Sequence, residues 1–461
     1  MSGAMWRSER AVVRFLQRRI ISVRNYSNAG DNHFDIIIAG GGMVGTSLAT
    51  ALGKNSRLSS KRILLLEGAK EFSWTLQEGK YSNRVVALNP NTRNFFSSLG
   101  VWNAIEDGRY GTVRKMQVWD GLSNAMITFS HDNLIDPVAY IVENDLILDA
   151  VNREAKTLNN VKILNEAKIK GYKLKGHESN VNSVVMDNGN NYTCNLLLGC
   201  DGANSQVRKA MDVQNMSWNY DQMGVVATLH LSEANDNIVA WQRFLPKGPI
   251  ALLPLADNLS SLVWSTSPDE AKHLLGLPND QFVDAVNGAL WKVHTTAGFV
   301  DEVTKAFDGF MQSLIGRSNA VRQLPPHVAS LEDGSRAAFP LGFGHAINYV
   351  KDGVALVGDA AHRVHPLAGQ GVNLGFGDAA CLSRLLGESV YNGKTLGDLD
   401  DLKHYECERQ RHNVPTMLAV DGLQKLYNTE FTPVVLLRSV GLQFTNALDP
   451  LKKLIMQQSA A

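Results

Sequence analysis

Three glycines at fixed spacing, Gly40, Gly42 and Gly45, constrain the fold of this chain more than any other feature. They follow an apolar run, Phe34–Ala39, which predicts a strand, and they lead into residues 43–53, which predict a helix. In such a unit the first glycine permits a tight turn and the second a close approach of a phosphate to the backbone. The third lets the helix pack on the strand. The spacing therefore predicts a parallel sheet with a phosphate-binding turn.

A carboxylate completes this unit. The next predicted strand, residues 62–67, ends in Glu67, which is placed to bond the 2′-hydroxyl of a ribose. A carboxylate would repel a 2′-phosphate, so FAD or NAD is preferred to NADP. A glycine-rich turn without a ligand would explain neither the glycine spacing nor Glu67.

A second constellation lies near the other end of the chain. Gly353 and Gly358 bracket a short apolar run that predicts a buried parallel strand, and Asp359 lies just past its carboxyl end. Open α/β sheets bind their ligands at that edge. Further on, Gly369 and Gly371 allow backbone N–H groups to approach a flat ligand, and a helix follows them.

Two more features are ambiguous when taken alone. An apolar strand near residues 196–200 delivers Asp201 and Gly202 to a turn. A lone Asp-Gly pair is usually a surface turn, but this one repeats the logic of Gly358-Asp359. Arg84 follows a polar loop and could equally face a cofactor or be a solvated cation.

The first residues have a separate composition. Arg7, Arg10, Arg14 and Arg18 share one face of a predicted helix in an acid-poor segment. This pattern is typical of a mitochondrial presequence, which we assign to residues 1–28. The alternative is a disordered basic tail.

Composition excludes several function classes. Lys and Arg total 45 and Asp and Glu total 45 in 461 residues, so no global field favours nucleic acid. No apolar run approaches the ~20 residues of a membrane span. The four cysteines lack CxxC spacing, so neither a metal site nor a disulfide scaffold is expected.

The rest of the chain predicts a second unit and a helical end. Residues 237–244, 250–255 and 260–266 predict an antiparallel sheet that bears Trp241 and Trp264. Such tryptophans belong to a core more often than to a binding wall. Residues 399–427 and 432–454 predict helices, of which the second could pack on the body, contact a partner or lie on a membrane.

These motifs, in this order, resemble those of the FAD-dependent aromatic hydroxylases of the para-hydroxybenzoate hydroxylase fold. The run from His365 to Asp378, HPLAGQGVNLGFGD, is similar to the signature of the ubiquinone-biosynthesis monooxygenases within that class. The resemblance covers nearly everything after residue 33. Together with the predicted presequence, the chain resembles the mitochondrial branch of that family.

The resemblance implies an α/β fold with a Rossmann-like FAD-binding domain, an antiparallel β-sheet substrate domain and a helical C-terminus. The implied boundaries are 33–111, 140–211 and 335–395 for a discontinuous FAD-binding domain, 112–139 and 212–334 for the substrate domain, and 396–461 for the helical region.

The resemblance also implies non-covalent FAD and the residues that hold it. Pro366, Gly369 and Gly371 would line the flavin, and no acid or base residue is identified with confidence. Where relatives often carry Arg near residue 144, this chain has Glu143-Asn144. The full implied cofactor site is Gly40, Gly42, Gly45, Glu67, Arg84, Asp201, Gly202, Gly358, Asp359, Pro366, Gly369, Gly371, Val372 and Asn373.

The implied reaction is hydroxylation of ring carbon 5 of a polyprenylated 4-hydroxybenzoate by O₂, through a flavin hydroperoxide. Residues 237–266 would form a wall for the prenyl tail. Ferredoxin and its reductase would supply electrons, and other coenzyme Q biosynthesis proteins would be partners. The implied location is peripheral, on the matrix side of the mitochondrial inner membrane.

Three other readings remain at this point. A prenyl reductase or a squalene-epoxidase-like enzyme would use the same fold on a lipid without an aromatic ring. An assembly subunit could keep FAD for stability alone. His362 and His365 could be catalytic, although a histidine beside a cofactor loop is more often structural.

Overall fold

The computed structural model describes residues 32–460, apart from residues 124, 132–134, 177–178, 234–235 and 370 and most of 293–322. Within that last stretch it describes residues 303, 306 and 309. The predicted presequence, residues 1–28, lies outside the described residues.

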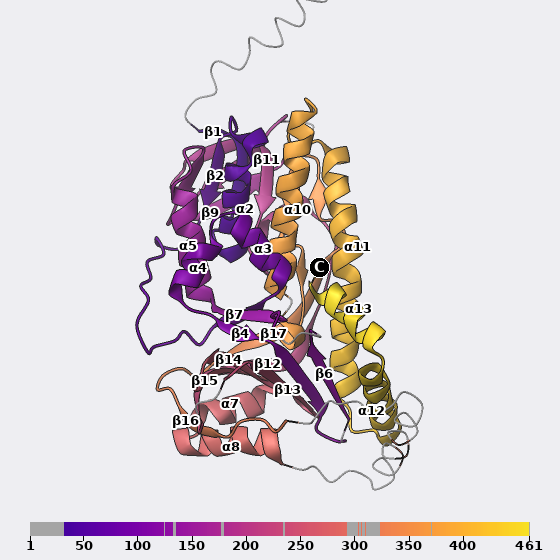
Figure 1. Ribbon diagram of the computed structural model, residues 1–461. Coiled ribbons are helices and arrows are strands. Elements are labelled where there is room, and N and C mark those ends of the chain that lie inside the picture. The colour runs from indigo at the N-terminus through magenta and orange to yellow at the C-terminus, as the bar shows by residue number, and fades with distance from the viewer. Residues whose placement is uncertain are drawn as a thin grey trace, which may run out of the picture.

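A mainly parallel sheet forms the upper part of the molecule (Figure 1). Its central strands β1, β2, β8, β11 and β19 run parallel, and β18 adds an antiparallel edge. Strands β1 and β2 are buried on both faces of the sheet, which explains their unbroken apolar sequence. The strands of this sheet are His33–Ala39 (β1), Ile63–Leu66 (β2), Val161–Leu164 (β8), Ile169–Lys173 (β9), Asn182–Met186 (β10), Asn191–Gly199 (β11), Val350–Lys351 (β18) and Val354–Leu356 (β19).

Helices cover this sheet and fill the space beside it. Helix α2 packs against both α5 and α10, and residues from β1, β2, β11 and β19 contribute to one large core. The helices of this part are Met43–Lys54 (α2), Ser56–Leu58 (η2), Pro90–Ser98 (α3), Trp102–Gly108 (α4), Asn144–Lys156 (α5), Gln206–Met211 (α6) and Gly371–Tyr391 (α10).

A larger sheet lies below the first (Figure 1). The three strands predicted at residues 237–266 are present, and the sheet also contains strands from the predicted 112–139 segment of the substrate domain and further strands that the sequence did not predict. Its strands are Lys115–Asp120 (β5), Met126–Ser130 (β6), Asn215–Leu231 (β12), Val239–Leu245 (β13), Gly248–Ala256 (β14), Leu259–Thr266 (β15), Val328–Leu331 (β16), Ala337–Ala346 (β17) and His362–Arg363 (β20).

Two helices, Pro268–Gly276 (α7) and Asn279–Trp291 (α8), cover one face of this sheet. Trp241 and Trp264 are buried in the core between that face and the two helices. The tryptophans are therefore core residues, as expected from their usual role.

A small sheet joins the two large ones. It consists of Val85–Leu88 (β3), Ala139–Glu143 (β7) and Gly111–Val113 (β4). The predicted domain boundary at residue 335 does not follow the sheets, because β17 pairs with β12 in the lower sheet. By strand pairing, β17 and β20 both belong to the lower sheet.

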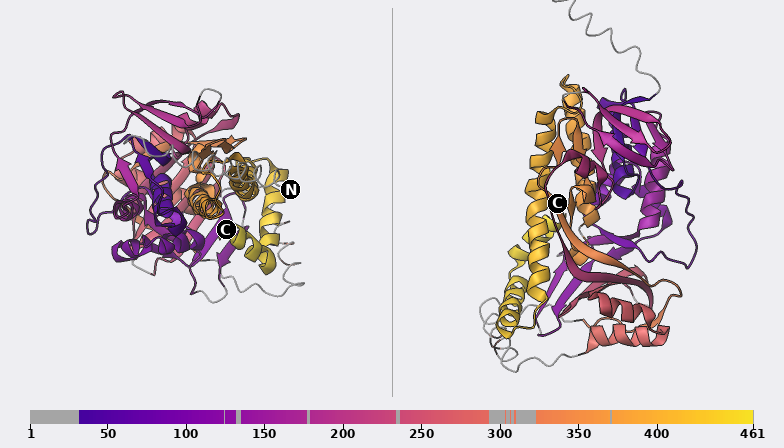
Figure 2. Two further views of the ribbon diagram at one scale, coloured as in Figure 1. Left: turned by 90° about the horizontal axis from the view of Figure 1, so that it is seen from above. Right: turned by 180° about the vertical axis from the view of Figure 1, so that it is seen from behind.

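Three helices form one flank of the molecule (Figure 2). The long helix Leu399–Tyr427 (α11) runs beside both large sheets, and Thr432–Ala447 (α12) and Asp449–Ala460 (α13) follow it. The sequence predicted a single helix over 432–454, but Leu448 is extended and Pro450 cannot continue the preceding helix. Among the described residues, no helix has both the length and the apolarity that a membrane span requires.

Candidate functional site

Three of the predicted motifs leave the upper sheet at neighbouring strand ends. Ala39 of β1 pairs with Gly199 of β11, and Gly199 pairs with Leu356 of β19. Gly40, Asp201 and Gly358 follow within two residues of these ends. The structure therefore brings together segments that are distant in sequence, at the carboxyl edge where such sheets bind ligands.

The three glycines of the first motif have three different environments. Gly40 has a φ of +105°, and a Cβ there would lie 2.4 Å from the carbonyl oxygen of Cys200. A Cβ on Gly45 would lie 2.0 Å from the carbonyl oxygen of Gly40. A Cβ on Gly42 would have no protein atom within 4 Å. Gly40 and Gly45 thus maintain the packing of the turn, while Gly42 faces open space where a ligand can approach.

The first turn of α2 and the acid beside it suit an anionic dinucleotide. Gly42 caps α2 without a side-chain hydrogen bond, so the first N–H groups of the helix are available to a phosphate. Glu67 accepts hydrogen bonds from the backbone N–H groups of Gly41 at 2.7 Å and Ala69 at 2.8 Å. Each carboxylate oxygen can accept a further hydrogen bond, which a ribose hydroxyl would supply.

Asp201 has one oxygen engaged and one unpaired. Its Oδ2 accepts from the N–H groups of Gln206 at 2.7 Å and Val207 at 3.1 Å, and so caps α6. Its Oδ1 is buried without a hydrogen-bond partner among the described residues. A buried oxygen without a partner is costly, so a ligand hydroxyl or N–H would be stabilised there. Gly202 follows with a φ of +75°.

Arg208 ties two of the loops together, a role that the sequence analysis missed. Its guanidinium donates to the carbonyl oxygen of Ala203 at 2.6 Å and to that of Ala360 at 2.6 Å. Ala203 belongs to the Asp201 turn, and Ala360 follows Asp359. One side chain thereby fixes the separation of two predicted cofactor loops.

Gly358 and Asp359 form a short 3₁₀ turn, η3 (Gly358–Ala360). Gly358 has a φ of +62° and packs against Val44 of α2, where a Cβ would lie 3.3 Å from the Val44 Cγ1. The side chain of Asp359 has no hydrogen bond to the described part of the chain, and the residue is exposed. Desolvation by surrounding protein raises the pKa of Asp359, and His362 and Arg363 partly offset that rise. Its carboxyl is thus open to a cofactor hydroxyl.

The loop predicted to line the flavin is held by Asn373. This side chain donates to the carbonyl oxygens of Ala87 at 2.8 Å and Gly369 at 3.0 Å. Its Oδ1 accepts from the Asn89 N–H at 3.1 Å and the Thr92 hydroxyl at 2.8 Å. Asn373 is therefore saturated by protein groups and positions the loop, rather than reaching toward a ligand.

The remaining loop residues surround that anchor. Pro366 begins a 3₁₀ turn, η4 (Pro366–Ala368), and Gly369 has a φ of +61°. Gly371 starts α10, and the half-buried Val372 packs on the neighbouring core. Gln370 lies outside the described residues.

Arg84 precedes β3, the strand whose Ala87 contacts Gly369. It is exposed, and its guanidinium has no hydrogen bond or ion pair to the part of the chain that the structure describes. Glu143, which precedes α5, is buried and pairs with Arg109 at 2.7 Å. Glu143 is therefore occupied by a structural ion pair.

His362 belongs to a buried charge cluster that the sequence analysis missed. Its Nε2 lies 2.6 Å from Oδ2 of Asp378, and Oδ1 of Asp378 accepts from Arg409 at 2.7 Å and Asn413 at 3.1 Å. Burial alone would raise the pKa of Asp378, but His362 and Arg409 together hold it well below its usual range. Oδ2 also accepts from the N–H of Gly358 at 3.0 Å, so the cluster supports the cofactor turn.

His365 is fully buried and its Nε2 lies 3.1 Å from Oε1 of Gln222, to which it donates. Burial lowers the pKa of His365 to about 4, although Asp421 opposes the shift. The ring is therefore neutral at neutral pH. The structural interpretation of both histidines agrees with these contacts.

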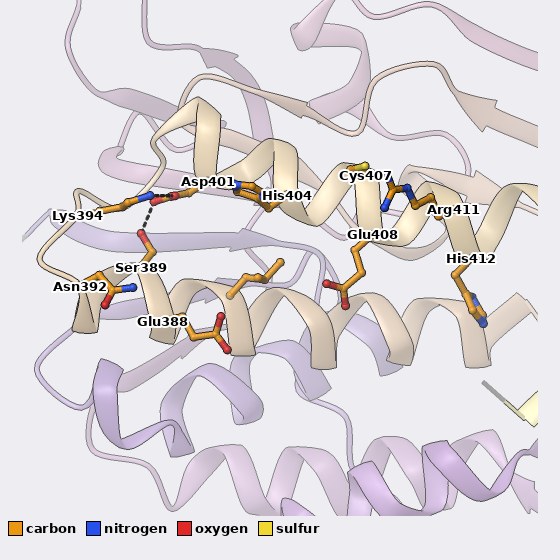
Figure 3. Close-up of a pocket in the computed structure, with 11 residues that line it drawn as sticks. Glu388, Ser389, Asn392, Lys394, Asp401, His404, Cys407, Glu408, Arg411 and His412 are labelled. Carbon is orange, nitrogen blue, oxygen red and sulfur yellow. Dashed lines mark hydrogen bonds and ion pairs between the residues drawn. The ribbon is translucent and has the colours of Figure 1, made fainter.

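A groove of about 730 Å³ lies elsewhere, between α10 and α11 (Figure 3). At one end Asp401 bonds Ser389 and Lys394, and further along Glu408 points toward α10 and pairs with Arg384 at 2.7 Å. None of the predicted cofactor residues lines it. Among the described residues, no three His, Cys, Asp or Glu side chains gather in a way that could hold a metal ion.

A family model, described as FAD binding domain, matches residues 33–306 and 326–417. The chain is 53% identical over 429 residues to the mitochondrial ubiquinone biosynthesis monooxygenase COQ6 of Drosophila melanogaster, covering 92% of this chain and 89% of that protein. It is 48% identical over 445 residues to the Homo sapiens protein of the same name, covering 95% of each.

Solved structures show the same fold at lower identity. PqsL, a probable FAD-dependent monooxygenase from Pseudomonas aeruginosa, superposes with a TM-score of 0.64 at 19% identity, covering 89% of this chain and all of that one. The p-nitrophenol 4-monooxygenase PnpA from Pseudomonas putida gives a TM-score of 0.64 at 16% identity, covering 93% and 99%. The predicted FAD-binding monooxygenase fold is thus confirmed.

Proposed function

The chain belongs to the family of mitochondrial COQ6 ubiquinone biosynthesis monooxygenases, and we propose that it hydroxylates ring carbon 5 of a polyprenylated 4-hydroxybenzoate intermediate. It is an FAD-dependent monooxygenase, and the resemblance predicted from its sequence is confirmed. The observation that best supports the proposal is the meeting of three motif loops at one sheet edge, braced by Arg208.

The residues around that edge fit FAD. Gly42 and the open first turn of α2 would take the pyrophosphate, and Glu67 the adenosine ribose. The unpaired Oδ1 of Asp201 and the carboxyl of Asp359 would accept hydroxyl groups of the cofactor. Arg84, Pro366, Gly369, Gly371 and Val372 would surround the flavin.

When bound, FAD supplies the activation of O₂ that no amino-acid side chain can provide. The protein's part is to orient the phenol ring and to keep water out. Backbone N–H groups at Gly371 and Val372, at the start of α10, would stabilise negative charge on the reduced ring. The hydroperoxide route remains a prediction, and no general acid or base is assigned.

The lower sheet offers a wall for the prenyl tail on the face opposite its tryptophans. Phe244 and Val118 lie on that face and form a cluster with Leu367 of the flavin loop. This cluster is buried between the sheet and α11, so an apolar environment that begins at the flavin loop would suit a ring attached to a long hydrocarbon chain. We therefore place the tail along this face rather than against Trp241 and Trp264.

The proposal includes a reductant and a location. Ferredoxin and its reductase would supply electrons, and other coenzyme Q biosynthesis proteins would be partners, as the resemblance implies. The relatives are mitochondrial by name, and we propose peripheral attachment to the matrix side of the inner membrane.

One preparation of residues 30–461 tests the proposal. Its visible spectrum reports FAD, and incubation with a prenylated 4-hydroxybenzoate, O₂ and reduced ferredoxin reports the reaction. The expected product carries one added oxygen atom at ring carbon 5. A hydrogenated or epoxidised tail would favour the reductase or epoxidase alternative. Absence of any product from flavin-loaded protein would favour an assembly subunit.

A further inference from the structure

Helix α12 buries several polar side chains, together with Val435, and exposes two large apolar ones. Arg438, Ser439 and Gln443 are buried against the body of the protein. Leu437 is 69% exposed, and Phe444, two helical turns further along, is 46% exposed. A surface helix ordinarily turns its apolar stripe toward the core, so this arrangement is reversed.

Polar contacts hold the helix in that orientation. Arg438 makes a bidentate ion pair with Asp120 at 2.8 and 3.0 Å, and both side chains are almost fully buried. Its guanidinium also donates to the backbone carbonyl oxygens at the end of α11 and just after it, and Ser439 bonds Ser123 at 2.7 Å. Rotation of α12 to bury Leu437 would break these bonds, so the apolar stripe is fixed on the outside.

The neighbouring helices extend the exposed stripe. We define the C-terminal apolar patch as six exposed side chains on α11, α12, α13 and the turn between the first two: Leu418, Leu423, Phe431, Leu437, Phe444 and Leu454. These helices form the flank seen in Figure 1. The end of α11 repeats the reversed pattern, because Asp421 and Gln424 are buried while Leu418 and Leu423 face out. A gathering of exposed apolar groups on one flank marks a contact surface.

The chemistry of the patch favours lipid over protein. Four of its six members are leucines, which are under-represented among the side chains that anchor protein interfaces. Among the described side chains from 411 to 456, the exposed cations are Arg411 beside the groove, Lys425, which pairs with Asp421 at 2.7 Å, and Lys453, and the exposed acid is Glu430. An apolar stripe with cationic margins is typical of helices that lie in the interface of an anionic bilayer.

The inner side of the same helices reaches the flavin loop. Val420 and Tyr427 of α11 and Leu442 of α12 share a cluster with Leu367 and Phe244. We infer that the C-terminal apolar patch docks the enzyme on an anionic lipid bilayer, beside the route by which a lipid enters the site. The choice of a bilayer rests in part on the prenylated substrate proposed above; the reversed helix polarity stands independently of it.

Vesicle flotation of the FAD-loaded chain, residues 30–461, tests this inference without substrate. Vesicles of phosphatidylcholine containing phosphatidylglycerol should carry the protein, and phosphatidylcholine alone should carry less. The double variant Leu437→Glu/Phe444→Glu should partition at least ~10-fold more weakly, because two charges enter the interface. Leu275→Glu/Tyr391→Glu is the matched control, since both residues are exposed on other helices and the charge change is identical. The control should float like the unmodified chain.

Flavin absorbance and unfolding midpoint, unchanged in both double variants, establish that they fold. Turnover of a substrate with a short, water-soluble tail should also be unchanged, so a failure of the proposed reaction is distinguishable from a failure of docking. Equal flotation after Leu437→Glu/Phe444→Glu would overturn the inference. So would an unmodified chain that ignores vesicles but forms dimers that this variant abolishes, which would identify a protein interface.

Discussion

Replacing Asp378 with asparagine should destabilise the chain and weaken its hold on FAD. The substitution keeps the shape of the side chain and removes its charge. Four donors converge on the native carboxylate, from His362, Gly358, Arg409 and Asn413. An amide can accept on one oxygen only, so its NH₂ group must face at least two of these donors.

The magnitude follows from burial. Asp378 is fully buried and Arg409 is 7% exposed, so the variant leaves a guanidinium in the interior without its counterion. Removing one partner of a buried ion pair costs about 3–5 kcal/mol. That is a large share of the roughly 5–15 kcal/mol that stabilises a native protein. The loss of the bond to the Gly358 N–H should also release the cofactor turn and raise the Kd for FAD.

Urea unfolding, followed by circular dichroism and by flavin fluorescence, measures both effects. Asp401→Asn is the control, since Asp401 also bonds a cation, but its partner Lys394 is exposed and the predicted cofactor residues do not line the groove in which the pair lies. It should lose less than about 1 kcal/mol and keep its FAD. A similar small loss in Asp378→Asn, with normal FAD content, would refute the argument that the buried cluster supports the cofactor turn.

Gly45→Ala should yield protein without FAD, because its Cβ would lie 2.0 Å from the Gly40 carbonyl oxygen, whereas Gly42→Ala should fold and bind FAD more weakly. The flavin absorbance of each purified variant measures its FAD content. Normal FAD affinity in Gly42→Ala would contradict the assigned pyrophosphate site. The pKa of His365 is lowered to about 4 by burial, so the unfolded chain binds its proton first as pH falls. Stability should therefore be full above pH ~6.5 and decline toward pH 4 by up to about 3 kcal/mol. His365→Gln should reduce that decline in urea midpoints measured at pH 7 and pH 5, and an unchanged decline would exclude His365 as its cause.

Local sequence patterns were sufficient to predict the start of the upper sheet. The apolar run of β1, the glycine turn and α2 are contiguous in the sequence, so the spacing of their residues is enough to predict this strand–turn–helix unit. The same holds for β19, Gly358 and Asp359. The contacts that fix these turns were not predictable, because Arg208 and Ala360 are 152 residues apart and Asp378 and Arg409 are 31 apart. No one-dimensional pattern encodes such pairs.

The lower sheet and the C-terminal flank show where periodicity misleads. Strand β12 begins with polar residues and contains a bulge near Asp221, whose φ is +52°, so its alternation is interrupted. In α12 the amphipathic pattern is clear, but its hydrophobic face is turned away from the core. In α12 the pattern predicts the helix, but it does not determine which side chains are buried.

The central position of β11 has a consequence for how the chain folds. His33 at the start of β1 bonds Thr193 of β11, 160 residues later. On its other side β11 pairs with β19, which lies still later in the sequence. The entropy of closing such long loops is lost before strand pairing contributes any stability. Folding is therefore slow, and unpaired strand edges stay exposed while it proceeds. The cofactor site cannot form until α10 has emerged, so early truncations should aggregate rather than persist as partly active fragments.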